Sequence, residues 1–185
     1  MVPLFDAFPN LAIHETVYEE LIMPSLRCFI DDKISTVPAK LKVRRDSELN
    51  SIEQNLLEMQ IQKLAPYSEY VPELDNSNDR GEIRSLAYMA VKNCLYFAAN
   101  DHLPIELINN ASELETGLDE MSVLQTYEII YYLYKTGKYT NKGLKMLYKY
   151  QYYLNSVDKG TNPDWTSFIQ KMDALYVSVS SDVSK

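Results

Sequence analysis

Acidic residues stand at both ends of one helix-and-strand segment in the middle of the chain. The motif DRGE at 79–82 opens a run of helical period, and Asp101 closely follows an apolar run at 95–99 that is short enough for a buried strand. Open α/β sheets gather functional side chains at the carboxyl ends of their strands. Carboxylates collected there are the hard oxygen ligands that Mg²⁺ and Mn²⁺ prefer. The segment therefore predicts metal chemistry at the carboxyl end of a sheet.

Each acid also has a structural interpretation that needs no ligand. Asp79 and Glu82 have the spacing of a capping box, in which two side chains bind free backbone N–H groups at a helix start. Asp101 could cap the helix that follows it. The upstream pair Glu19 and Glu20 could be the solvated face of a helix. The order of acids and elements favours the functional interpretation more than any single residue does.

Hydrophobic periodicity predicts the elements that position these acids. Short apolar runs indicate strands at 11–14, 95–99 and 121–124, the second covered on both faces. Helical periods follow the first run and recur at 48–64, 83–94 and 104–110. In the 48–64 helix one apolar face would carry Ile52, Leu56, Met59 and Leu64. Residues 31–46 look like a loop or a loosely held helix entry. This alternation favours a helix-rich three-layer α/β/α fold with a short parallel sheet, the alternative being a mostly α-helical bundle.

The last third of the chain is dense in tyrosine, with nine of them between positions 127 and 153. Tyr127, Tyr131 and Tyr134 share one helical face. A turn around Gly137 separates that helix from the next. Such a stripe indicates packing, with hydroxyls at the rim, rather than a platform on which bases stack.

Composition limits the kinds of partner. The 185-residue chain has a net charge of −8, so overall attraction to phosphate could not support nucleic-acid binding, which would need local basic patches. Cys28 and Cys94 lie in apolar runs and match no metal or redox spacing, which indicates buried thiols and a reducing cytoplasm. No stretch of about 18 apolar residues could span a bilayer.

Together with the segment IHETVYEEL at 13–21, the central segment is similar to the PIN domain, a family of metal-dependent nucleases that cut mostly RNA. The resemblance implies one or two Mg²⁺ or Mn²⁺ ions, which activate a water for phosphodiester hydrolysis. By position it implies Glu20, Glu82 and Asp101 as catalytic and metal-binding residues. Asp79 would be a neighbouring or substitute metal ligand.

The chain departs from the family pattern at its start. PIN domains begin with a strand that ends in an Asp and is followed by a helix, whereas the first residues here would match the region after that helix. Asp6 cannot take the first role, because four residues before the run at 11–14 leave no room for a helix. The missing strand would be central, so its neighbours would lack a ladder partner. We therefore expect a PIN-like domain at 1–155, truncated at its N-terminus, and a C-terminal helix and tail at 156–185.

Three function classes are compatible with these patterns. The first is a PIN-like ribonuclease or its inactive remnant, of the kind found in toxin–antitoxin pairs or in RNA processing. The second is a non-catalytic helical domain for protein–protein interaction. Another phosphate-handling enzyme is least supported, because the P-loop, GxSxG, HExxH and CxxC spacings are missing. Expected partners are RNA, an antitoxin or other protein, and a second copy of the chain, with no membrane.

Overall fold

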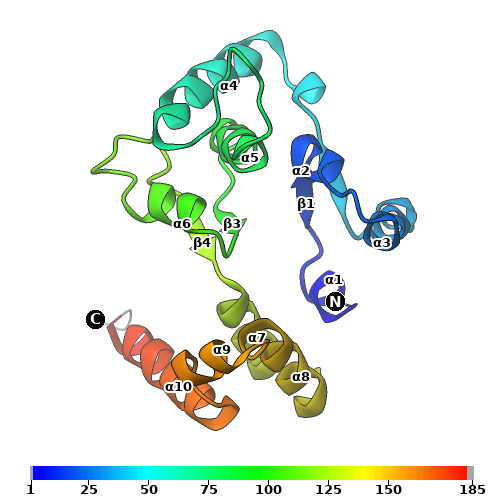
Figure 1. Cartoon of the computed structure of the whole chain (residues 1–185), viewed down its shortest axis with the longest axis vertical. Helices are drawn as coiled ribbons and strands as arrows, with labels where there is room; N and C mark the ends of the chain where they lie inside the picture. The colour runs from blue at the N-terminus through cyan, green and yellow to red at the C-terminus, as the bar shows by residue number, and fades with distance from the viewer. Residues whose placement is uncertain (1, 183–185) are drawn as a thin grey trace. The chain divides into compact units, whose positions relative to one another are not determined.

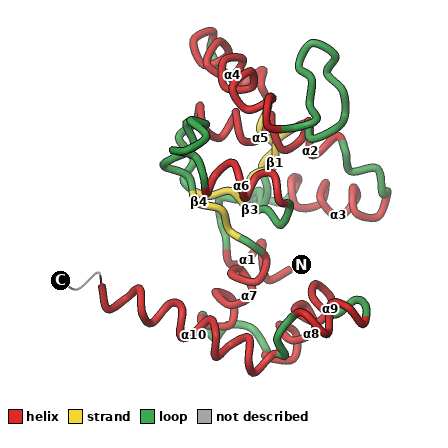
Figure 2. The backbone as a smooth tube through the Cα atoms, turned by 60° about the vertical axis from the view of Figure 1, so that its left-hand side comes forward, coloured by secondary structure: helices red, strands yellow, loops and turns green. Residues whose placement is uncertain are grey.

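The computed structural model describes residues 2–182. Helices dominate this part of the chain and the strands are short (Figure 2). The chain divides into two compact units, Met1–Leu124 and Gln125–Lys185. The division therefore falls directly after the last strand of the described chain, whereas the sequence predicted a domain boundary near residue 155. Residues 183–185, at the end of the expected tail, lie outside the described residues. No helix of the described chain is long and apolar enough to cross a membrane.

Ten helices and four strands follow one another along the described chain (Figure 1). The helices of the first unit are α1 (Val2–Ala7), α2 (Glu15–Glu19), α3 (Pro24–Ser35), α4 (Ser51–Leu64), α5 (Arg80–Val91) and α6 (His102–Asn109). Its strands are β1 (Ala12–His14), β2 (Lys42–Arg44), β3 (Tyr96–Ala98) and β4 (Ser122–Leu124), and short 3-10 turns lie at η1 (Asp46–Glu48) and η2 (Ala65–Tyr67). The second unit contains α7 (Thr126–Lys135), α8 (Asn141–Tyr152), α9 (Ser156–Thr161) and α10 (Trp165–Asp182).

The strands form two separate parallel pairs. β1 pairs with β2, with Ile13 opposite Val43, and β3 pairs with β4, with Phe97 opposite Val123. The strands predicted at 11–14, 95–99 and 121–124 are confirmed. β2 lies in the region 31–46, where the sequence predicted no strand. Its single apolar residue stands between two charged ones and gives little periodic signal. Helices alternating with parallel strands agree with an α/β fold. The described strands form two separate two-stranded sheets instead of the single sheet that was expected, and a three-layer arrangement stays a prediction.

The expected burial of residues 95–99 on both faces is wrong. Leu95 is 57% exposed and Tyr96 is 62% exposed, while Phe97 is only half-buried. β3 has one ladder partner, and a sheet of two strands is too narrow for helices to cover both of its faces. Apolar side chains of this strand therefore remain in solvent.

Helix α5 is the centre of the first unit. It packs against α4, α2, β1 and α6, and its Ile83 and Leu86 are fully buried. Tyr88, two residues after Leu86, is also buried and lies against the His14 ring, with ring centroids 5.3 Å apart. Residues of α2, α5 and β3 line one pocket beside this helix.

The apolar face predicted for α4 is wrong apart from Leu64. Leu57, Ile61 and Leu64 are buried at spacings of four and three. Ile52, Leu56 and Met59 point instead to solvent, with exposed fractions of 72%, 47% and 69%. Both stripes have helical spacing, so periodicity alone could not distinguish the face that meets α5.

The prediction of buried thiols is also wrong. Cys28 is exposed and Cys94 is partly exposed. In α3 the buried position is Ile30, and Cys28 lies on the other side of the helix. Cys94 falls beyond the end of α5, after Asn93, whose φ of 50° breaks the helix.

The tyrosine stripe of Tyr127, Tyr131 and Tyr134 packs internally, as predicted. The core of the second unit is formed by Ile130, Tyr131, Tyr148, Phe168 and Met172. The rings of Tyr148 and Phe168 stack with centroids 4.4 Å apart, an arrangement typical of aromatic cores. This core joins α7, α8 and α10.

Candidate metal-binding site

The three acids that the PIN resemblance singles out line one pocket of the first unit. Glu20 is the C-cap residue directly after α2, Glu82 lies in the first turn of α5, and Asp101 precedes α6. The pocket has a volume of about 150 Å³. Its remaining walls come from α2, α5, β3 and α6: Val17, Gly81, Ser85, Phe97, Ala98, Ala99 and Pro104. The structure thus gathers carboxylates that lie up to 81 positions apart in the chain.

Gly81 allows α2 and α5 to meet at this pocket. The backbone N–H of Gly81 donates a hydrogen bond to the Glu20 carboxylate. A Cβ at position 81 would lie 2.9 Å from both carboxylate oxygens of Glu20 and 3.0 Å from Cγ2 of Val17. Any side chain larger than hydrogen would therefore displace the carboxylate. Sequence reasoning assigned no role to this glycine, although a glycine in the first turn of a helix is a signal of close approach.

The surroundings of Glu20 in the pocket disfavour its negative charge. Partial burial and the neighbouring Glu82 raise the pKa of Glu20, while Arg80 and the Gly81 N–H act in the opposite direction. Carboxylates that lie near one another without a cation between them raise one another's pKa in this way. A cation bound between the carboxylates would relieve this repulsion.

In the described part of the chain, neither Asp79 nor Asp101 caps a helix with its side chain, which was the structural interpretation of these two acids. Asp79 occupies the N-cap position of α5 with a φ of 53°, but its side chain accepts a hydrogen bond from the Glu69 N–H, at 2.8 Å, instead of capping the helix. Asp101 occupies the N-cap position of α6 and makes no side-chain cap bond there. Asp79 does not line the pocket, so the structure separates it from the other predicted ligands.

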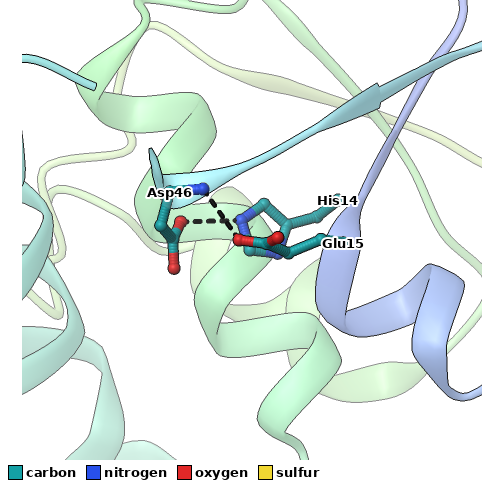
Figure 3. A group of neighbouring side chains, drawn as sticks. All are labelled: His14, Glu15 and Asp46. Carbon is teal, nitrogen blue, oxygen red and sulfur yellow. Dashed lines mark hydrogen bonds and ion pairs between the residues drawn. The ribbon is translucent and has the colours of Figure 1, made fainter. Parts of the chain in front are cut away.

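The pocket acids are more widely spaced than a set of ligands to a single ion. Among residues 2–182, the group whose ligand atoms all lie within 4.8 Å of one another is His14, Glu15 and Asp46. This second group joins β1, the start of α2 and η1 (Figure 3). Sequence reasoning assigned no role to Asp46, because it lies in the segment predicted as a loop.

The bonds within this second group indicate a structural clamp. His14 Nε2 and Asp46 Oδ1 are 2.9 Å apart, and the Asp46 N–H donates to Glu15 Oε1 at 2.8 Å (Figure 3). His14 Nδ1 lies 2.8 Å from the hydroxyl oxygen of Thr16, and the Arg84 guanidinium donates to the other Asp46 oxygen. An ion here would have to break these bonds and stand beside a guanidinium.

The clamp has a clear electrostatic signature. Hydrogen bonds from His14 and Arg84 outweigh the burial of Asp46 and hold its pKa below the ordinary value. The carboxylate in turn raises the pKa of Arg84. The clamp ties η1 to β1 and α5. Glu20, Glu82 and Asp101 form no ion pair among the described residues, so their charge could be offered to a cation.

No family model, curated protein or solved structure matches the chain.

Proposed function

We propose that the chain is a PIN-like metal-dependent nuclease domain that acts on single-stranded or structured RNA. The observation that carries this proposal is the pocket that Glu20, Glu82 and Asp101 line together from three separate elements. Glu82 contributes to the raised pKa of Glu20, as expected where acids are collected for a ligand. Perturbed carboxylates in a concave site are a common mark of catalytic function.

The three carboxylates would hold Mg²⁺ or Mn²⁺, which supplies an activated water and neutralises charge on the phosphodiester. Their donor atoms fit such ions, because hard oxygen ligands suit both. Their wide spacing favours contact through metal-bound waters, several of which Mg²⁺ usually keeps. The chain itself orients Glu20 through the Gly81 N–H.

Cleavage by this chain should be weak or absent, because Asp6 is the only acid that the sequence offers for the first position of the PIN pattern. Asp6 lies on α1 and pairs with Lys40, away from the pocket lining. We therefore expect metal binding to be easier to observe than hydrolysis.

Calorimetric titration of the full chain with Mn²⁺ tests the proposal. Binding should be lost when Glu82→Gln and Asp101→Asn are combined. It should persist when Glu58→Gln and Glu113→Gln are combined, because these exposed acids lie outside the pocket and the charge change is the same. Binding that survives loss of the pocket acids would refute the proposed site.

A further variant separates the pocket from the clamp. Glu15→Gln keeps an oxygen that accepts from the Asp46 N–H but removes the carboxylate charge. Mn²⁺ affinity should be unchanged in this variant. Loss of binding in Glu15→Gln, with binding retained in the pocket variants, would assign the ion to the clamp instead.

An interaction domain is the second candidate, and the exposed stripe of α4 favours it. Ile52, Leu56 and Met59 recur at spacings of four and three on one side of the helix and are largely in solvent. Such a stripe suits the apolar groove or helix of a protein partner, such as an antitoxin or a second copy. If the stripe mediates a homodimer, Leu56→Glu should convert the chain to a monomer in sedimentation experiments, whereas Glu58→Gln should not.

A further inference from the structure

One face of α8 combines basic and large apolar side chains. Lys142, Lys145 and Lys149 are exposed, as are Met146 at 64% and Tyr150 at 72%. At about 100° per residue these five positions fall within an arc of about 140°. We call this surface the α8 lysine face.

Packing of the second unit determines which way this face points. Leu144 and Tyr148, on the opposite side of α8, are buried in the core with Phe168. The hydroxyl of Tyr148 also donates to the carbonyl oxygen of Pro163 at 2.7 Å. Because α8 is fixed on that side, its lysines stand in solvent.

The positive charge of this face is not neutralised within the described chain. Some other lysines have acidic partners: Lys135 lies 3.0 Å from Asp173, and Lys92 lies 2.8 Å from Glu53. Residues 141–152 include no acidic side chain, and the three lysines of the α8 lysine face have no ion pair among the described residues.

The charge is also unevenly distributed over the sequence. The second unit has eight lysines against five acidic residues, although the whole chain carries a net charge of −8. Overall attraction cannot hold a polyanion on such a protein, so a local patch has to do so. The α8 lysine face is a patch of that kind.

We propose that the α8 lysine face binds the phosphate backbone of single-stranded RNA, with Tyr150 stacking on a base. Lysines that follow the backbone next to an exposed aromatic ring are the usual combination for single-stranded nucleic acid. The lysines alone would suit any polyanion, and the choice of RNA rests on the proposed nuclease function. The face would hold substrate independently of the metal.

The salt dependence of binding gives a measurable magnitude. Each phosphate neutralised on a single strand contributes about −0.7 to the slope of log affinity against log salt. Three lysines therefore contribute roughly −2, which corresponds to a loss of affinity of roughly 20-fold between about 50 and 200 mM salt.

The test is fluorescence anisotropy of a labelled oligouridylate with the full chain in EDTA. Binding should weaken strongly, and its salt slope should flatten by about 2, when Lys142, Lys145 and Lys149 are all changed to Gln. The matched control changes three exposed lysines elsewhere to Gln, namely Lys63, Lys159 and Lys171. This variant loses the same charge and should bind like the wild type. All six side chains are exposed, so thermal melts should show both triple variants folded.

Two further variants examine the aromatic contribution. Tyr150→Ala should weaken binding several-fold, and Tyr150→Phe should retain it, because stacking needs the ring and not the hydroxyl. The proposal is overturned if the wild type does not bind, or if both triple variants bind alike. It is also overturned if polyglutamate competes as well as RNA while Tyr150→Ala has no effect, because an acidic protein would then be the partner.

The outcome is separate from that of the nuclease proposal. RNA binding through these lysines without Mn²⁺ binding at the pocket would refute the nuclease proposal alone. Mn²⁺ binding at the pocket, with RNA binding indifferent to the lysines, would refute the α8 lysine face alone.

Discussion

The contact between Gly81 and Glu20 makes a sharp prediction for Gly81→Ala. The new methyl group would lie 2.9 Å from both Glu20 carboxylate oxygens. Because these atoms end a flexible side chain, the carboxylate can swing away, but it then loses its hydrogen bond to the backbone N–H at position 81. The Val17 methyl, 3.0 Å away, has less freedom to move.

Two opposing energies decide the effect on stability. Loss of a hydrogen bond to a charged group costs about 1.5 to 3 kcal/mol, and the exposure of Glu20 places the cost at the lower end. Replacing glycine by alanine in a helix recovers up to about 1 kcal/mol. We therefore expect a net destabilisation of roughly 1 kcal/mol. Mn²⁺ affinity should fall at least about tenfold, as is typical when the hydrogen bond that orients a metal ligand is lost.

Urea unfolding and Mn²⁺ calorimetry measure the two effects separately. Gly160→Ala is the matched control, because Gly160 also lies in a helix and a Cβ there would meet nothing within 4 Å. In a Glu20→Ala background, Gly81→Ala should cost less than in the wild type, because the carboxylate it displaces is gone. Equal costs in the two backgrounds, or unchanged Mn²⁺ affinity in Gly81→Ala, would refute the reasoning.

Four other predictions concern charge and sheet edges. Glu82→Gln should raise the Tm at neutral pH, because the charge of Glu82 helps raise the pKa of Glu20 and so disfavours the ionised form of Glu20 in the folded protein. This gain in Tm should vanish in acid, where Glu20 is protonated. Asp46→Asn should lower the free energy of unfolding by roughly 2 to 3 kcal/mol, measured in urea, because it weakens the bonds to His14 and Arg84. Since the Asp46 pKa is lowered, the wild type should keep this contribution above pH 3.8, the ordinary value, and lose it as the pH falls through the lowered pKa. Any Mn²⁺-dependent RNA cleavage should disappear in Asp101→Asn while the Tm stays nearly unchanged, and cleavage that persists would contradict the catalytic assignment. The exposed apolar strand β3 should make the chain marginally stable or self-associating, so a highly stable melt that is independent of protein concentration would contradict an incomplete sheet.

Several elements could be predicted from the sequence because their signals are local. Helix α5 has an apolar period that continues through its whole length, and the strands β1, β3 and β4 are short apolar runs next to turn residues. Acids placed between such elements could therefore be named in advance. Their gathering in one pocket agrees with that order, while their catalytic role stays a prediction.

Other features depend on partners far away in the chain. The clamp joins Asp46 to His14 and Arg84, which lie 32 and 38 positions from it, and no local pattern marks such a pair. Strand β2 exists because β1 offers it a ladder, although its own composition is mostly charged.

The two sides of α4 show most clearly what sequence periodicity cannot predict. Its sequence places apolar stripes on both sides of one helix, so amphipathic periodicity alone leaves the orientation open. Only packing against α5 buries Leu57 and Ile61 and leaves Ile52 and Met59 in solvent. The sequence by itself determined that this segment is a helix, because backbone hydrogen bonds and propensity act locally. The tertiary structure decided which face is core, because burial is a property of the surfaces that meet.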